Sequence, residues 1–172
     1  MKSPNALLLD PRFVDHDTGP GHPECAARYQ AVAAAIQDQP WAAEPQRIAS
    51  RPATEEELLR VHTPRYLETV RADIASGRDD LSTGDTALCP ASLRVAEKAA
   101  GGVLAVVDAV MTGQARRAFC AVRPPGHHAR PAQGMGFCIF NNVALAARHA
   151  QAAHGAGKVA IIDWDVHHGN GT

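Results

Sequence analysis

The chain has 172 residues, and 45% of them are hydrophobic, which is enough for one domain (residues 1–172) with a substantial core. Its formal net charge of −1 gives no electrostatic reason to expect binding to nucleic acid or to an anionic membrane surface. No stretch approaches the about 18 consecutive apolar residues that a membrane-spanning helix needs.

The N-terminus lacks the features of a secretory signal, because its apolar run at residues 6–9 is too short to form the apolar core of one. The cysteines show no Cys-x-x-Cys spacing, and we interpret them as reduced thiols. They are Cys25, Cys89, Cys120 and Cys138. Both observations predict a cytoplasmic protein.

The first part of the chain predicts short strands separated by a helix. Residues 6–9 are typical of a buried strand, and the Gly, Pro and Asp content of residues 12–22 indicates a loop. Pro23 favours the first position of a helix that runs to about Gln37. One face of this helix carries Tyr29, Val32 and Ile36. Residues 47–49 predict another short strand.

Two further helices are predicted next. Thr54 and Glu57 have the spacing of a capping box, which starts a helix that extends to Val61. Pro64 begins the following helix, and its buried face is predicted from the spacing of Tyr66, Leu67, Val70 and Ile74. His62 lies between the two helices, where a histidine usually packs or caps, so we interpret it as structural.

A polar loop at residues 77–89 separates these helices from the longest one. Its acidic side chains could touch a substrate, but such a run is more often simply solvated. The long helix is predicted at residues 90–111, and its small residues at 99–102 favour close packing against another element.

The last part of the chain predicts a strand at residues 118–122, a loop at 123–140, a helix at 141–153 and a strand at 158–163. Helices that alternate with strands this apolar indicate an α/β fold, with a parallel sheet covered by helices on both faces. Ligands bind such sheets at the carboxyl ends of the strands. Because the two most polar motifs follow the two strands, we expect them to share one site.

The second of these motifs contains Asp163, Asp165 and His167. Residues two apart on an extended chain project to the same face, so the three side chains would converge. Two carboxylates and an imidazole at the end of a strand resemble part of a metal site. The alternative is a strand that ends in a solvated polar turn, and we would prefer it for an isolated Asp-x-Asp.

The first motif places His127 and His128 directly after Pro-Pro-Gly, in a rigid turn. Imidazoles transfer protons well near neutral pH, because their unperturbed pKa is about 6.5. A histidine pair beside a metal site predicts metal-assisted hydrolysis. A surface His-His pair would be the better interpretation if either motif stood alone.

Three ordered motifs carry a resemblance to a known family. They are Arg-Pro-Pro-Gly-His-His-Ala (123–129), Gly-Met-Gly-Phe-Cys-Ile-Phe-Asn-Asn-Val-Ala (134–144) and Asp-Trp-Asp-Val-His-His-Gly-Asn-Gly-Thr (163–172). Together they resemble the zinc-dependent histone deacetylase family, in particular its class II and bacterial branch, which includes acetylpolyamine amidohydrolases. The resemblance implies an arginase/deacetylase-like fold, of which the chain would form the N-terminal part, incomplete at the C-terminus.

The resemblance also implies catalytic roles. His128 matches the general base that takes a proton from zinc-bound water and later protonates the leaving amine. His127 matches the histidine that stabilises the developing charge. Asp163 matches the carboxylate that orients His127, and Asn170 matches the residue paired with His128.

Two metal sites are implied in the same way. Asp165 and His167 match two ligands of the catalytic Zn2+. Asp163 and Asp165, with the main-chain carbonyl of His167, match a structural site for a monovalent cation such as K+.

Three residues match substrate-contacting positions of the family. Gly136 and Phe137 match the wall of a narrow tunnel that admits an acetyl-lysine-like chain, although Phe137 could also be ordinary core. Arg28, in a His-Pro-Glu-x-x-x-Arg pattern, matches an arginine near a product-release channel, or is a surface cation. The implied substrates are acetyl-lysine and acetylated polyamines.

The family's second zinc-binding aspartate and its tyrosine cannot be located in these 172 residues. Because catalytic zinc normally takes three protein ligands, we expect this polypeptide alone to bind zinc weakly and to be inactive. Two alternatives stay open. One is a deacetylase-like module that is non-catalytic or is completed by a partner, and the other is an arginase-like metallohydrolase. The chain could also form a homo-oligomer.

Overall fold

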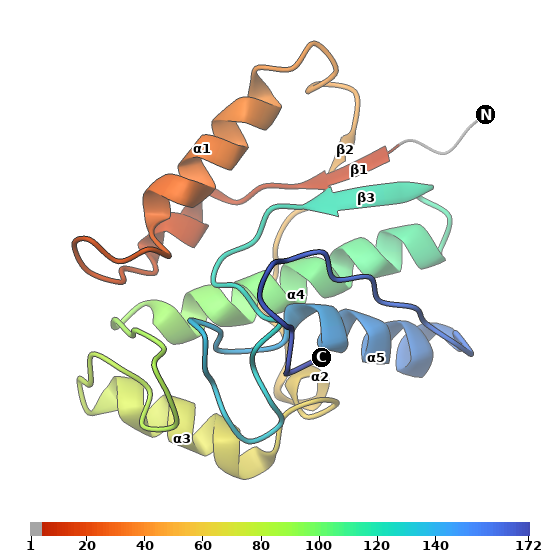
Figure 1. Cartoon of the computed structure of the whole chain (residues 1–172). Helices are drawn as coiled ribbons and strands as arrows, with labels where there is room; N and C mark the ends of the chain where they lie inside the picture. The colour runs from red at the N-terminus through yellow and green to blue at the C-terminus, as the bar shows by residue number, and fades with distance from the viewer. Residues whose placement is uncertain (1–4) are drawn as a thin grey trace.

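A computed structural model describes residues 5–172 and places a three-stranded parallel sheet between helices (Figure 1). In the sheet β1 (Asn5–Leu8) is central, with β2 (Gln46–Arg47) and β3 (Arg117–Cys120) on its two sides. Helices α4 (Ser92–Met111) and α5 (Asn142–His154) lie on one side of the sheet, and α1 (Ala26–Gln37) lies on the other. This arrangement confirms the predicted fold class.

The smaller elements are η1 (Pro11–Asp15), α2 (Glu55–Leu58) and α3 (Pro64–Ala75). The capping box at Thr54 is present, with both of its reciprocal hydrogen bonds, but α2 ends before the predicted Val61. Helix α3 begins at Pro64 as predicted and buries Tyr66, Leu67 and Val70. These side chains pack with α4 and α5 in the larger hydrophobic core.

The small residues of α4 allow the close packing that the sequence predicts. A Cβ on Gly101 would lie 2.3 Å from the main-chain oxygen of Arg51, and one on Gly102 would lie 2.8 Å from Leu8. Gly101 and Gly102 therefore let α4 pack directly against the sheet and against the segment that precedes α2.

Helix α1 differs from the prediction in its start and in its buried face. It begins at Ala26 because the preceding residues are held in other contacts: the main-chain N–H of Glu24 donates to His22, and its carbonyl accepts from Thr18. Of its predicted apolar face only Tyr29 is buried, whereas Val32 is 45% exposed.

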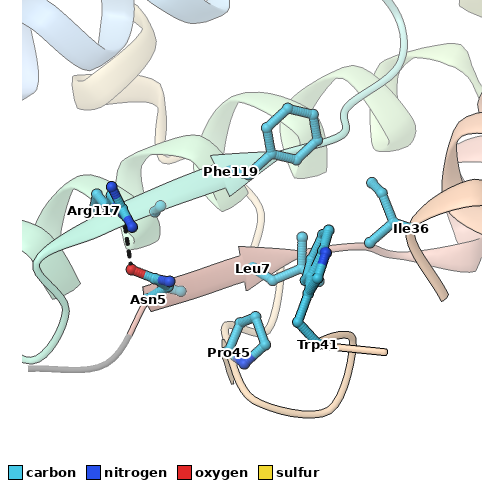
Figure 2. Close-up of a pocket in the computed structure, with 9 residues that line it drawn as sticks. Asn5, Leu7, Ile36, Trp41, Pro45, Arg117 and Phe119 are labelled. Carbon is cyan, nitrogen blue, oxygen red and sulfur yellow. Dashed lines mark hydrogen bonds between the residues drawn. The ribbon is translucent and has the colours of Figure 1, made fainter. Parts of the chain in front are cut away.

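The sheet face next to α1 keeps an open apolar pocket. Figure 2 shows Leu7 and Phe119 on neighbouring strands, with Ile36 at the end of α1 and Trp41 in the loop after it. Phe119 is 55% exposed and Trp41 is 45% exposed. Among the described residues, α1 and its loop therefore cover this face only in part.

The prediction of a strand at residues 158–163 is wrong, because this segment pairs with no strand in the described part of the chain. Residues 159–162 instead line an apolar groove with α4, α5 and β3. Ile162 is 83% exposed and Trp164 is 90% exposed. An apolar run becomes a buried parallel strand only when both of its faces are covered, and here every residue from 158 to 163 is exposed.

No helix within residues 5–172 is both long and apolar enough to cross a membrane. All four cysteines are free thiols. Cys138 is fully buried in the core, and this burial raises the pKa of its thiol to about 12.

His62 connects α3 to the part of the chain that follows the histidine pair. Its Nδ1–H donates to the carbonyl of Arg130 at 3.1 Å, and its Nε2 accepts from the N–H of Asn141 at 3.0 Å. Since both ring nitrogens are used and the side chain is buried, the neutral form is favoured. Burial lowers the pKa of His62 to about 4.

We predict that acidification destabilises the fold through His62. The unfolded chain takes up a proton on this histidine below about pH 6.5, whereas the folded chain does so only near pH 4, where its lowered pKa lies. The stabilisation is therefore complete above pH 6.5 and is lost as the pH falls to about 4. The difference corresponds to about 3 kcal/mol.

Urea unfolding measured between pH 7 and pH 4.5 tests this effect. The free energy of unfolding should fall less steeply with pH for His62→Gln than for the unaltered protein. Equal slopes for the two proteins would show that His62 is not responsible.

Candidate functional site

The loop after β3 brings His127 close to the segment at residues 163–172. Nδ1 of His127 lies 2.8 Å from Oδ2 of Asp163. The carbonyl of His127 also accepts a hydrogen bond from the N–H of Gly171 at 2.9 Å. These contacts join two motifs that are 36 residues apart in the sequence.

His128 makes a matching contact with the same segment. Its Nδ1 lies 2.7 Å from Oδ1 of Asn170, so the amide oxygen accepts the Nδ1–H and leaves Nε2 as the nitrogen that can accept a proton. The rings of His127 and His128 are 4.1 Å apart, centre to centre. Two oriented imidazoles therefore stand side by side.

Asp165 and His167 lie next to this pair on the exposed part of the segment. Oδ1 of Asp165 accepts from the main-chain N–H of His167 at 2.7 Å and lies 3.1 Å from its Nδ1. The ring of His167 is 6.2 Å from that of His128. The structure thus brings together six of the predicted site residues: His127, His128, Asp163, Asp165, His167 and Asn170.

The donor atoms of Asp165 and His167 are compatible with zinc. In a tetrahedral site with bonds of about 2.0–2.2 Å, neighbouring ligand atoms lie about 3.3 Å apart. The separation of 3.1 Å between the carboxylate oxygen and Nδ1 is close to this value. Within residues 5–172, no third His, Cys, Asp or Glu completes a group around these two atoms.

Hydrogen bonds keep both carboxylates ionised. The pKa of Asp163 is lowered, first by its hydrogen bond with His127 and then by the N–H of Asp165. The pKa of Asp165 is lowered mainly by the N–H of His167. Both groups can therefore orient an imidazole or hold a cation at neutral pH.

Gly136 and Phe137 form a tight turn against the histidine pair. Both have positive φ angles, 55° for Gly136 and 67° for Phe137. The N–H of Gly136 donates to Asp85 at 2.7 Å, and the ring of Phe137 stacks edge-on against His22 at 4.6 Å. A positive φ costs a non-glycine residue about 1–3 kcal/mol, so the surrounding contacts must hold Phe137 in place.

Arg28 is not close to these residues. It is exposed on α1 and lines a separate pocket with Glu24, Arg123 and Pro125. Arg28 therefore shares a pocket with residues at the start of the loop that carries the histidine pair. Its role in product release stays a prediction.

The start of that loop is fixed by a buried ion pair. The guanidinium of Arg123 donates to Oε1 of Glu24 at 2.6 Å and to the carbonyl of Phe13 at 3.1 Å, and it also donates to the carbonyl of His16. The side chains of Arg123 and Glu24 are 3% and 4% exposed. Their positions are therefore strongly constrained by each other.

The sequence did not indicate some of the residues that build the site. Asp85 is exposed, as expected for the polar loop at residues 77–89, but its carboxylate also accepts from the N–H of Gly136 across 51 residues of sequence. Glu24, which lies just before α1, forms its ion pair with Arg123 across 99 residues of sequence. A second cluster, formed by Asp108, His149 and His154, was not predicted because its members have no recognisable spacing. No local pattern signals such long-range contacts.

Comparison with known proteins gives consistent matches. A model of the histone deacetylase domain matches residues 22–172. The chain is 41% identical, over 98% of its length, to a histone deacetylase-like amidohydrolase of Pseudomonas aeruginosa, of which it covers 44%. It is 44% identical over 73% of its length to the human polyamine deacetylase HDAC10, of which it covers 19%.

A solved structure, the crystal structure of the HDA15 HD domain, superposes with a TM-score of 0.89 at 38% identity. The match covers 98% of this chain and 49% of that one. The chain thus spans about half, or less, of the length of these proteins.

We predict that Gly136→Ala disturbs the site beyond ordinary backbone strain. A Cβ at this position would lie 2.3 Å from Cδ2 of His128, so the ring has to move. Gly155→Ala is a matched control, because Gly155 also has a positive φ but a Cβ added there would have nothing within 4 Å. We expect Gly136→Ala to unfold at lower urea, by about 1–3 kcal/mol more than the control.

A shift of the His128 ring resonances in NMR spectra should accompany this loss. Equal destabilisation by the two substitutions, with unshifted His128 resonances, would mean that the turn does not confine the ring.

Proposed function

Because the chain belongs to the histone deacetylase family, we propose that its histidine pair and zinc ligands serve a zinc-dependent hydrolase that removes acetyl groups from acetyl-lysine or acetylated polyamines. The observation that supports this most directly is the pairing of His127 with Asp163 and of His128 with Asn170, beside Asp165 and His167. The family match favours this reaction over that of an arginase-like hydrolase.

His128 is the proposed general base. With its Nδ1–H held by Asn170, its Nε2 is available to accept a proton from the attacking water. The water oxygen bonds to the acetyl carbon, and the amide C–N bond then breaks. The same nitrogen returns its proton to the leaving amine, so acetate and a free amine are formed.

His127 is the proposed partner in charge stabilisation. Asp163 fixes the orientation of its ring, which would help it to stabilise negative charge on the acetyl oxygen. Asp165 and His167 would hold the zinc ion. When bound, zinc lowers the pKa of a coordinated water to about 7 and polarises the carbonyl.

Gly136 and Phe137 are the proposed wall of the substrate tunnel. The turn presses against His128, so the ring of Phe137 would give a narrow substrate chain an apolar surface close to the histidine pair. The names of two similar proteins support this class of reaction and substrate. The human relative is called a polyamine deacetylase, and the relative from Pseudomonas aeruginosa is called an amidohydrolase. Potassium at Asp163 and Asp165 remains a further proposal.

We predict that His128→Ala lowers kcat for deacetylation by about 10²–10⁴-fold, because general acid–base catalysis contributes that much. The assay uses the protein as its source cells produce it, with zinc, an acetyl-lysine peptide and acetylated spermidine as the substrates. Arg65→Gln on the exposed side of α3 is the control and should keep the full rate. Undiminished activity in His128→Ala would rule out the assigned role.

We also predict that residues 1–172, expressed alone, retain zinc weakly and show no robust deacetylation. Asp165 and His167 are two donors, whereas catalytic zinc takes three protein ligands and a water. Zinc content after dialysis and the rate of acetate release measure the two effects. Stoichiometric zinc with rapid turnover would contradict the expectation.

A further inference from the structure

A second cluster of side chains of the types that can bind metals lies between α4 and α5, away from the histidine pair. Nε2 of His149 is 2.6 Å and Nε2 of His154 is 2.7 Å from the same oxygen, Oδ1 of Asp108. The three ligand atoms lie within 4.8 Å of one another. His149 and His154 come from the last turns of α5, and Asp108 comes from the last turn of α4.

The position of the cluster suits an ion that enters from solvent. The side chain of His149 is 6% exposed and that of His154 is 18% exposed, so their rings are held by the surrounding protein. The carboxylate of Asp108 is 41% exposed, which leaves a path for an ion and for water ligands. Fixed imidazoles and one accessible carboxylate are a common donor set for first-row transition metals.

We propose that Asp108, His149 and His154 form a binding site for a divalent transition metal such as zinc. The ion would replace the two protons that now bridge the imidazoles to the carboxylate. Because neighbouring zinc ligands lie about 3.3 Å apart, the two contacts of 2.6 and 2.7 Å would lengthen by about 0.6–0.7 Å. The bound ion would tie the end of α4 to the end of α5. This site is independent of the proposed deacetylase activity.

The neighbours of His149 show which group can accept its ring proton when a metal binds. To bind metal through Nε2, His149 must carry its proton on Nδ1, and a metal-bound imidazole usually donates that proton to a carboxylate. Oε1 of Glu57 lies 4.0 Å from this Nδ1 and is the available acceptor. In the structure Nδ1 is instead 2.7 Å from Nη1 of Arg60, so the arginine must turn away when the metal binds.

Two positive charges compete with the metal. Arg60 lies against His149, and Arg51 is 4.0 Å from Oδ2 of Asp108. The side chain of Arg60 is 21% exposed and can rotate into water, whereas Arg51 is held by Glu57 through hydrogen bonds of 2.6 and 2.8 Å. Removing the charge of Arg60 should therefore tighten metal binding, an effect that a purely structural hydrogen-bond cluster would not produce.

The experiment titrates Co2+ and Zn2+ into the protein carrying Asp165→Ala and His167→Ala, which removes the donors of the candidate catalytic site. Visible absorption reports the coordination of Co2+, and calorimetry gives the affinity and stoichiometry for Zn2+. In this background we expect one equivalent of each metal to bind and the melting temperature to rise with Zn2+.

Further substitutions in that background locate the ion. His154→Gln and Asp108→Asn should each weaken Zn2+ binding at least tenfold and abolish the rise in melting temperature. Arg60→Gln should strengthen binding several-fold. Arg148→Gln, on an exposed position of α5, is the control and should change neither quantity.

Circular dichroism distinguishes loss of the site from loss of the fold. If His154→Gln unfolds, Asp108→Asn and Arg60→Gln still provide the test. Absence of metal binding in the background protein, or equal affinity in Asp108→Asn, would overturn the proposal and leave the cluster as a hydrogen-bonded link between two helices.

Discussion

The buried ion pair between Arg123 and Glu24 is the interaction on which the site most depends. Arg123 follows β3 and begins the loop that carries the histidine pair. Glu24 lies just before α1. Through this pair and the carbonyls of Phe13 and His16, the loop is anchored to the N-terminal part of the chain. Removal of one partner of such a pair costs about 3–5 kcal/mol, because the other charge is left buried alone.

Close backbone contacts also hold the segment at residues 163–172 against the loop that carries the histidine pair. A Cβ on Gly169 would lie 2.4 Å from Oδ2 of Asp163, and one on Gly171 would lie 2.3 Å from the carbonyl of Ala129. The segment at residues 163–172 can therefore reach the histidine loop only because these positions are glycines. The conformation that aligns His127 with Asp163 thus follows from the Gly-Asn-Gly sequence as much as from the ligand residues.

Much of the fold and of the site could be predicted from the sequence where the signal is local. Pro64 and the capping box at Thr54 determine helix starts through neighbouring atoms, and the motifs around His127 and Asp163 carry their own turn residues. Predictions failed where distant contacts decide. The run at residues 158–163 has the composition of a strand, but its outer side has no cover.

Anomalous X-ray scattering at the zinc edge, from crystals of the protein as its source cells produce it, grown with zinc, locates the metal directly. We expect a peak about 2.0–2.1 Å from a ring nitrogen of His167 and next to the carboxylate of Asp165, with His127 and His128 facing its open side. A second peak at Asp108, His149 and His154 is compatible with this result. A map with no peak between Asp165 and His167 would contradict the proposed catalytic centre.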